Sequence, residues 1–351
     1  MNNLKEEKLN PSLAFWYKDC FHMLLLAILS YYDGDVYDLL LNSYYLYNID
    51  EDNQLFLDEV FVTNDDIYTI LGRSGIKCEG VFIRKEDVVN KLIETFEESD
   101  FYIVGVDSYF ESIRSDTYNR EHLAHALFIY NVDKSNEIFH VYEHTFRFSS
   151  TYKKKELSFP EVSKAINYFQ SNLTNPAFTK NTIPAFCLVD NKFPAYFRFK
   201  KDSNYNTSFE KSNTILKFLF YYKSKLSYVK ESVDLITKFR DGYKDIYLSK
   251  ERLEKSLENI NRIIINKKIE FYIFNEILNS VNDLDILQNK CIVNWSYVRA
   301  VSAKKLYSEK VNYNHLRDIM DRLDEIIENE KLYYTLLEQL CEMKVRFYND
   351  K

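Results

Sequence analysis

Glycine and proline are scarce in this sequence, with 6 glycines and 5 prolines among 351 residues. After Pro194 there is no further proline and a single glycine, Gly242. Because these residues disfavour helices more than any others, their scarcity after Pro194 favours a helical C-terminal region, which we expect from about Ser208 onward. The 5 cysteines are widely scattered and form no CxxC pair, which indicates neither a disulfide framework nor a structural zinc site.

A long apolar run and an excess of positive charge are also missing. The longest uninterrupted apolar run is Met23–Leu29, whereas a membrane span needs about 20 residues. The 53 Asp and Glu residues outnumber the 46 Lys and Arg residues, and this formal net charge of −7 argues against a nucleic-acid-binding protein. The polar N-terminus, MNNLKEEKLN, lacks the apolar core of a signal peptide. We therefore expect a cytoplasmic protein with reduced thiols that binds neither membranes nor nucleic acid.

The residues that are present predict an α+β fold with two domains, over residues 1–204 and 205–351. For the second domain we expect an all-α bundle of roughly four to six helices. Gly242 follows a cationic turn and is interpreted as the end of one of these helices. The apolar stripes fit an internal bundle or a homodimer interface equally well. One such stripe consists of Leu253, Leu257, Ile260 and Ile264.

The first domain mixes helices and strands, and we expect a buried helix packed on an antiparallel sheet. The segment Cys20–Tyr32 is apolar on every side, which predicts that central helix. Two runs rich in β-branched and aromatic residues, His125–Asp133 and Ile138–Phe148, are separated by a short polar stretch typical of a β-hairpin. The other expected strands are Cys78–Ile83, Phe101–Val106, Ile183–Val189 and Ala195–Phe199, and the other expected helices are Lys85–Phe96 and Pro160–Phe169.

Cys20 begins the most buried of the predicted helices. The unpaired N–H groups and partial positive charge of a helix N-terminus stabilise a thiolate, and they also stabilise an oxyanion on an acyl group attached to the sulfur. A nucleophilic cysteine is therefore one interpretation, and a small buried core residue is the other. The core interpretation is preferred for the remaining cysteines, Cys78, Cys187, Cys291 and Cys341.

A cysteine nucleophile requires an imidazole base, which in turn requires an orienting partner. If His125 pairs directly with Glu143 across the hairpin, their side chains share one face and meet. If the register slips by one residue, His125 faces His144 instead. The sequence leaves both registers open. Most of the 6 histidines lie in this segment, at His122, His125, His140 and His144.

The run from His140 to His144 also matches the HxxEH pattern of a class of zinc peptidases, in which one helix presents both histidines. Here the run has the composition of a strand. A strand separates residues four apart by about 13 Å, too far for one zinc ion with ligand bonds of about 2 Å. We therefore expect no metal.

The order of these residues resembles papain-like cysteine peptidases, and most closely the family named for the N-terminal domain of butirosin biosynthesis protein H. A cysteine on an early helix is followed by a histidine that opens a hairpin and then by an acid on the returning strand. The resemblance covers roughly the first 200 residues. It is carried by Tyr17–Met23 and by the stretch from Val104 through His122 and His125 to Glu143.

Members of this family move acyl groups from carrier proteins to amines in antibiotic biosynthesis, and related enzymes of the closthioamide type form amide bonds without ATP. The resemblance implies a papain-like catalytic domain with Cys20 as nucleophile, His125 as base and Glu143 as orienting acid. It implies no cofactor, and it implies an acyl or peptidyl carrier protein and a small or carrier-bound amine as partners. The usual third residue is Asp or Asn rather than Glu, and Ala14 occupies the position of an oxyanion-binding Gln. The Tyr17 hydroxyl and the Cys20 N–H are the remaining candidate donors.

Two other functions fit the same residues: a peptidase or amidase, and a non-catalytic interaction protein in which Cys20 is simply buried. Carrier proteins are acidic, so docking on a chain with a net charge of −7 would need local basic clusters. Two such clusters occur, and solvated lysine loops are their alternative interpretation. They comprise Arg147 with Lys153, Lys154 and Lys155, and Arg198 with Lys200 and Lys201.

Overall fold

The computed structural model describes residues 20–34, 36–41, 43–62, 65–145, 152–175, 178, 192–202, 211–278, 282–308 and 312–349. It confirms the α+β class, with antiparallel sheets and many helices. The chain separates into two compact units, residues 1–39 with 64–209, and residues 40–63 with 210–351. The sequence did not indicate that residues 40–63 group with the helical C-terminal part. None of the helices in the described ranges is long and apolar enough to cross a membrane.

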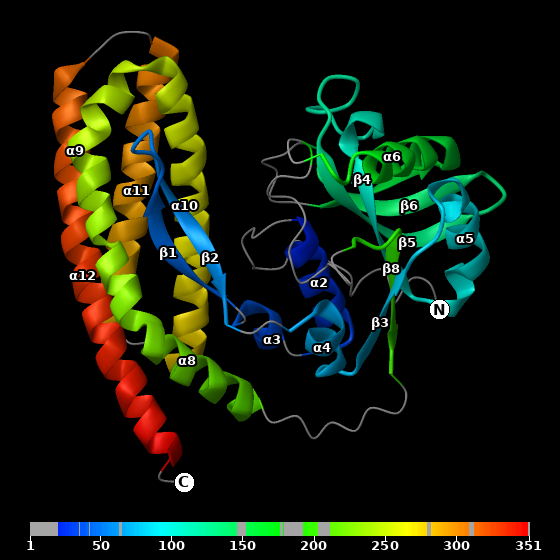
Figure 1. Ribbon diagram of the computed structural model, residues 1–351, viewed down its shortest axis with the longest axis horizontal. Coiled ribbons are helices and arrows are strands. Elements are labelled where there is room, and N and C mark those ends of the chain that lie inside the picture. Colours follow the sequence, from blue (N-terminus) through cyan, green and yellow to red (C-terminus); the bar gives the residue numbers. More distant parts are fainter. Residues whose placement is uncertain are drawn as a thin grey trace. The chain divides into compact units, whose positions relative to one another are not determined.

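The first unit is built on a six-stranded antiparallel sheet (Figure 1). Its strand order is β3-β8-β4-β5-β6-β7. Every residue of β4 is buried, as expected for a central strand covered on both faces. The predicted hairpin is present as β5 and β6. The strands are β3 (Ile76–Val81), β8 (Tyr196–Lys201), β4 (Phe101–Asp107), β5 (Ala124–Asp133), β6 (Ile138–Glu143) and β7 (Lys153–Ser158). The predicted strand Ile183–Val189 lies outside the described residues.

One face of this sheet is covered by α5 (Val88–Thr95) and α6 (Phe159–Ser171). The helix α6 begins with a capping box between Ser158 and Glu161 and has a proline in its first turn, which explains why it starts there. Apolar side chains of both helices pack on the sheet residues that share this face. These residues include Tyr102, Val104, Val106, Leu127, Ile129, Phe139, Val141 and Tyr196. Shorter elements of this unit are α4 (Ile67–Gly72), η1 (Lys85–Asp87), η2 (Phe96–Glu98) and η3 (Ser108–Phe110), and α3 (Tyr37–Leu40) ends at the boundary.

The other face carries α2 (Cys20–Tyr31), the predicted central helix. Nine of its residues, Phe21 to Leu29, are buried without interruption. At its C-terminal end, the rings of Tyr31 and Tyr32 meet Phe101 edge to face, with centroids 4.7 and 6.0 Å apart. Since Phe101 alternates with Tyr102 along β4, this face is opposite to the one that α5 and α6 cover.

The second unit contains a helical bundle and a β-hairpin. The hairpin strands β1 (Ser43–Ile49) and β2 (Leu55–Phe61) pack on α8, α9 and α10. The helices are α8 (Lys211–Ser232), α9 (Asp234–Leu248), α10 (Lys250–Leu278), α11 (Asn282–Ser308) and α12 (Tyr313–Asn349). The prediction that Gly242 ends a helix is wrong, because it lies inside α9. A Cβ there would make only ordinary van der Waals contact with Asn53 in the hairpin turn, at 3.5 Å, so packing does not require a glycine.

A buried ion cluster holds this unit together. The ammonium group of Lys267 in α10 donates to Glu330 Oε2 at 2.7 Å, to Glu270 Oε2 at 3.0 Å and to the Tyr334 hydroxyl at 2.6 Å. The hydroxyl of Tyr47 in β1 donates to the other oxygen of Glu330 at 2.8 Å. A single polar network therefore joins the hairpin to α10 and α12, which explains why residues 40–63 group with the helices.

Candidate functional site

A histidine–carboxylate pair lies at one end of the sheet. His125 is the second residue of β5 and Glu143 is the last residue of β6. His125 Nε2 lies 2.8 Å from Glu143 Oε2, and both side chains are buried. Because the carboxylate accepts from Nε2–H, the neutral imidazole has its lone pair on Nδ1. Within the described residues no hydrogen bond occupies that nitrogen.

The register that brings the two residues together is neither of the two predicted ones. Phe128 pairs with Tyr142 and Ile129 with Val141, but the register shifts before Asn131 pairs with His140. One step beyond Tyr142, Glu143 therefore stands opposite Leu127 rather than opposite His125. His125 and Glu143 lie on one face and meet diagonally, a geometry that antiparallel strands allow for long side chains.

Arg114, in the loop between η3 and β5, completes this pair. Its Nη1 donates to Glu143 Oε1 at 3.0 Å and lies 3.5 Å from His125 Nε2. Two further bonds of 3.1 Å bind its guanidinium to Asp116. The side chain is 1% exposed, so this is a buried, fixed cation beside the carboxylate. The sequence analysis did not identify Arg114, because an arginine in a loop has no pattern that reveals its partners.

Burial and charge set the protonation of the pair. Burial and, to a lesser extent, the Arg114 charge lower the pKa of His125 to about 4, so the imidazole is neutral near pH 7. Burial raises the pKa of the Glu143 carboxyl, and the adjacent Arg114 charge opposes that rise. A neutral imidazole with its lone pair on Nδ1 is the form that a general base requires.

Glu111 lies beside the same cluster without a partner. It is 1% exposed, and neither carboxyl oxygen forms a hydrogen bond to the described residues. Burial and the nearby Glu143 charge raise the pKa of Glu111 to about 8. Glu111 is therefore a protonated, uncharged acid over most of the neutral range.

His125, Glu143 and His144 also lie close enough to one another to bind one metal ion. The ligand atoms of His125, Glu143 and His144 lie within 4.8 Å of one another. However, Arg114 bonds one oxygen of Glu143 and lies beside His125, so a divalent cation would have to displace a buried guanidinium. The HxxEH run is a strand, as expected. His140 is bound within the sheet to Glu156 of β7, at 3.6 Å.

Cys20 is the first residue of α2 and is half-buried. The helix packs against β5, the strand that carries His125. Its length is about 16 Å, close to the roughly 17 Å from Phe101 to Val106 along β4. A helix of this length that runs along β4 from Phe101 ends level with Val106, at the end of the sheet that holds His125 and Glu143.

A chain of aromatic rings leads from the first turn of α2 to β4. Phe21 meets Phe193 edge to face at 5.4 Å, and Phe193 meets Phe169 at 5.5 Å. The Phe169 ring covers Gly105, where any Cβ would come within 2.2 Å of it. These rings link the first turn of α2, through Phe193, to the side chain that packs on Gly105 of β4.

The predicted basic clusters lie far apart. Lys153, Lys154 and Lys155 form the start of β7, and Lys153 pairs with Glu143 at the site end of the sheet. Lys200 and Lys201 lie at the opposite end, because Phe199 pairs with Phe101. Arg198 is bound to Glu79 and Glu98 at 2.7 and 2.9 Å, which neutralises much of its charge. The two clusters therefore do not form one surface. Tyr17 and Arg147 lie outside the described residues.

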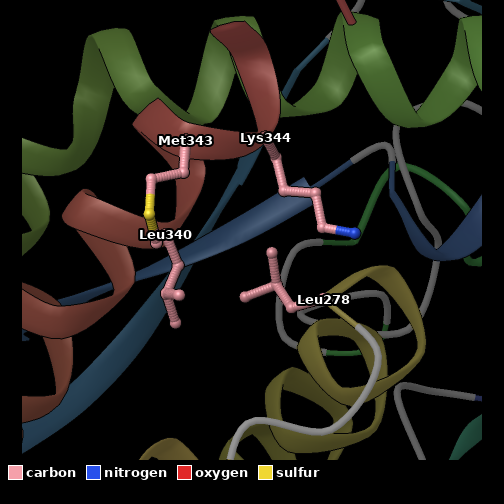
Figure 2. Close-up of a pocket in the computed structure, with 4 residues that line it drawn as sticks. All are labelled: Leu278, Leu340, Met343 and Lys344. Carbon is pink, nitrogen blue, oxygen red and sulfur yellow. The ribbon is translucent and has the colours of Figure 1, made fainter. Parts of the chain in front are cut away.

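An open hollow in the helical unit offers no comparable chemistry. Figure 2 shows it between α10 and α12, with Lys344 as its single charged residue. Its volume is about 320 Å³. It is lined by Leu278, Leu340, Met343 and Lys344, and it contains none of the predicted site residues.

No protein-family model matches this sequence, and no curated protein matches it either. The resemblance to the butirosin biosynthesis family therefore stays a prediction.

Proposed function

We propose that the first unit is a papain-like cysteine acyltransferase that forms amide bonds, with Cys20 as nucleophile, His125 as base and Glu143 as orienting acid. The observation that carries the proposal is the buried His125–Glu143 pair, 2.8 Å apart, at one end of the sheet on which α2 packs. Nucleophile, base and orienting acid then come from three elements in the papain-like order.

In the first half-reaction the Cys20 thiol gives its proton to His125 Nδ1, and its sulfur attacks the carbonyl carbon of an acyl thioester on a carrier protein. The new C–S bond forms as the carrier C–S bond breaks, and the departing thiolate takes the proton back from His125. In the second half-reaction an amine attacks the acyl-enzyme. A C–N bond forms, the C–S bond to Cys20 breaks, and the amine proton leaves through a base.

The helix N-terminus supplies the oxyanion site in this scheme. The first N–H groups of α2 have no partner within the helix, and they point toward the end where an acyl group on Cys20 would lie. The proposal requires that the thiol and His125 meet across the end of β5, since His125 shares its sheet face with Val106. His125 is the second residue of β5, one residue from that end.

A peptidase or amidase would use the same residues and differ only in releasing the acyl group to water. Product analysis separates the two functions. The protein would be incubated with an acyl-loaded carrier protein and a panel of amines, and amide and free acid would be quantified by mass spectrometry. We expect amide to exceed acid for at least one amine, with both lost in Cys20→Ala. Acid alone would support the hydrolase, and wild-type yields in Cys20→Ala would exclude covalent catalysis.

Cys78→Ala is the matched control in that assay. Cys78 lies in β3 at the far end of the sheet, where Phe199 is its strand partner. Burial raises the pKa of its thiol well above the usual value, so it is a poor nucleophile. Its removal should leave amide formation unchanged.

A further inference from the structure

A second histidine–carboxylate pair lies at the same end of the sheet. His122 Nδ1 lies 2.5 Å from Asp107 Oδ2. The other carboxylate oxygen accepts from the backbone N–H groups of Tyr109, at 3.1 Å, and Leu123, at 3.0 Å. The Asp107 side chain is fully buried, and these three hydrogen-bond donors fix its orientation. Because a carboxylate accepts from Nδ1–H, the acceptor nitrogen of neutral His122 is Nε2.

The His122 ring is covered on both faces. Tyr109 stacks on one side with a centroid distance of 4.2 Å and an angle of 16°, and Tyr168 stacks with 4.3 Å and 8°. The His122 side chain is nevertheless 41% exposed. With both faces and the Nδ1 edge covered, the exposed part is the opposite edge, which carries Nε2. The fold thus presents one rigidly held imidazole nitrogen at the surface.

Asp107 lies on the α2 side of the sheet, and His122 stacks on Tyr168 of α6. Asp107 pairs with Ala124, and Ser108 N–H donates to Leu123 O where the chain turns into η3. Asp107 and Phe101 are six residues apart on β4, so their side chains share one sheet face, and the C-terminal end of α2 contacts Phe101 on that face. Tyr168 adjoins Phe169, which is linked through Phe193 to Phe21, the residue after Cys20.

We propose that His122 is a second general base of the Cys20 site, serving the incoming amine, with Asp107 as its positioning residue. This inference rests on the acyl transfer proposed above. The two histidines differ in exposure. His125 is 7% exposed, which suits proton exchange with a group of the protein itself, whereas His122 is open to a substrate that arrives from solution. In the second half-reaction the amine nitrogen bonds to the acyl carbon, its proton passes to His122 Nε2, and the Cys20 C–S bond breaks to leave a thiolate. The proton then returns to that thiolate, directly or through water.

The two half-reactions can be measured separately. Wild-type protein and variants would be loaded from an acyl-carrier donor, and intact-protein mass spectrometry would follow loading and then loss of the acyl group after addition of amine. We expect His122→Ala to load within about twofold of the wild-type rate and to transfer to amine roughly 100-fold more slowly, the usual scale of a lost general base. Asp107→Asn should show a smaller loss in transfer alone.

Imidazole rescue separates a chemical role from a structural one. The slot between Tyr109 and Tyr168 remains in His122→Ala, so added imidazole should restore part of its transfer rate. The matched control is His140→Ala, since His140 is also paired with a carboxylate on this sheet, at 3.6 Å from Glu156. It should match wild type in both half-reactions.

Three outcomes would overturn the inference. Transfer at the wild-type rate in folded His122→Ala would remove His122 from the reaction. Loss of loading in His122→Ala, with normal unfolding behaviour, would make His122 the base of the thiol instead. Failure of wild-type protein to load at all would refute the acyl transfer itself, which is a distinct result because it does not depend on the variant.

Discussion

Glu143 accepts hydrogen bonds from both His125 and Arg114, one on each carboxylate oxygen, at 2.8 and 3.0 Å. A third bond, 2.7 Å long, comes from the backbone N–H of His144. The carboxylate therefore orients the imidazole and also neutralises a buried guanidinium. These two roles have separate consequences when Glu143 is changed.

Glu143→Gln should reduce stability as well as activity. The amide still accepts one hydrogen bond from His125 or Arg114, but it no longer balances the buried Arg114 charge. Breaking a buried ion pair costs about 3–5 kcal/mol, so we expect a loss at the lower end of this range because Asp116 remains bound to Arg114. Urea unfolding would measure it. Activity at a temperature where the variant is folded should fall less than in His125→Ala, and an unchanged unfolding midpoint would contradict the charge-balancing role.

Stability should fall as pH rises from 6.5 to 8, because of Glu111. Its pKa is about 8 in the folded protein against an ordinary value of 4.5, so across this window the unfolded chain has released a proton that the folded protein still binds. Stability then decreases with pH by up to about 1.4 kcal/mol per unit. His125, with a pKa of about 4 against 6.5, acts in the opposite sense and only as pH falls below 6.5.

Glu111→Gln tests this assignment. The amide does not titrate, so the slope of unfolding free energy between pH 6.5 and 8 should flatten in the variant. Denaturant unfolding at several pH values would give both slopes. Equal slopes in the two proteins would show that Glu111 is not the titrating group.

The helical unit should depend strongly on Lys267. Lys267→Met leaves Glu270 and Glu330 buried without their cation, which should cost about 3–5 kcal/mol. Adding Glu270→Leu and Glu330→Met should recover much of that loss, because an apolar set of similar volume needs no charge balance. Circular dichroism during urea unfolding would compare the three proteins. Equal stability of wild type and Lys267→Met would refute the cluster's role.

Carrier docking should involve only one of the two basic clusters. Lys154 lies in β7 near the site, whereas Lys200 lies at the other end of the sheet. Lys154→Glu should raise KM for an acyl-carrier donor several-fold and leave a small acyl-pantetheine donor unaffected. Lys200→Glu is the matched control and should change KM for neither donor. An equal effect of both variants, or no effect of either, would exclude β7 as the docking strand.

The sequence predicted the elements of the first unit better than their pairing. The apolar run of α2, the buried strand β4 and the β5–β6 hairpin were all recognisable from composition. The register was not, because the irregularity between Ile129 and Asn131 leaves no mark in a run of strand-forming residues. Lys153, Lys154 and Lys155 were interpreted as a docking cluster or, alternatively, as a solvated loop, and no strand was predicted there, yet they form the start of an edge strand.

The sequence likewise predicted only some of the residues of the site. His125 and Glu143 were named because residues on one face of a hairpin can meet. Arg114 and Glu111 were missed, since their role depends on where a loop folds over the end of the sheet. The stacked environment of His122 was equally unpredictable, because Tyr168 comes from α6, far along the chain.

The most direct test of the account is the mass of the intact protein after mixing with an acyl-loaded carrier protein. We predict a mass gain equal to the acyl group, located on the peptide that contains Cys20, removed by hydroxylamine and absent in Cys20→Ala. It should form much more slowly in His125→Ala. An acyl group on another residue, or wild-type amide formation by folded Cys20→Ala, would contradict the proposed cysteine chemistry.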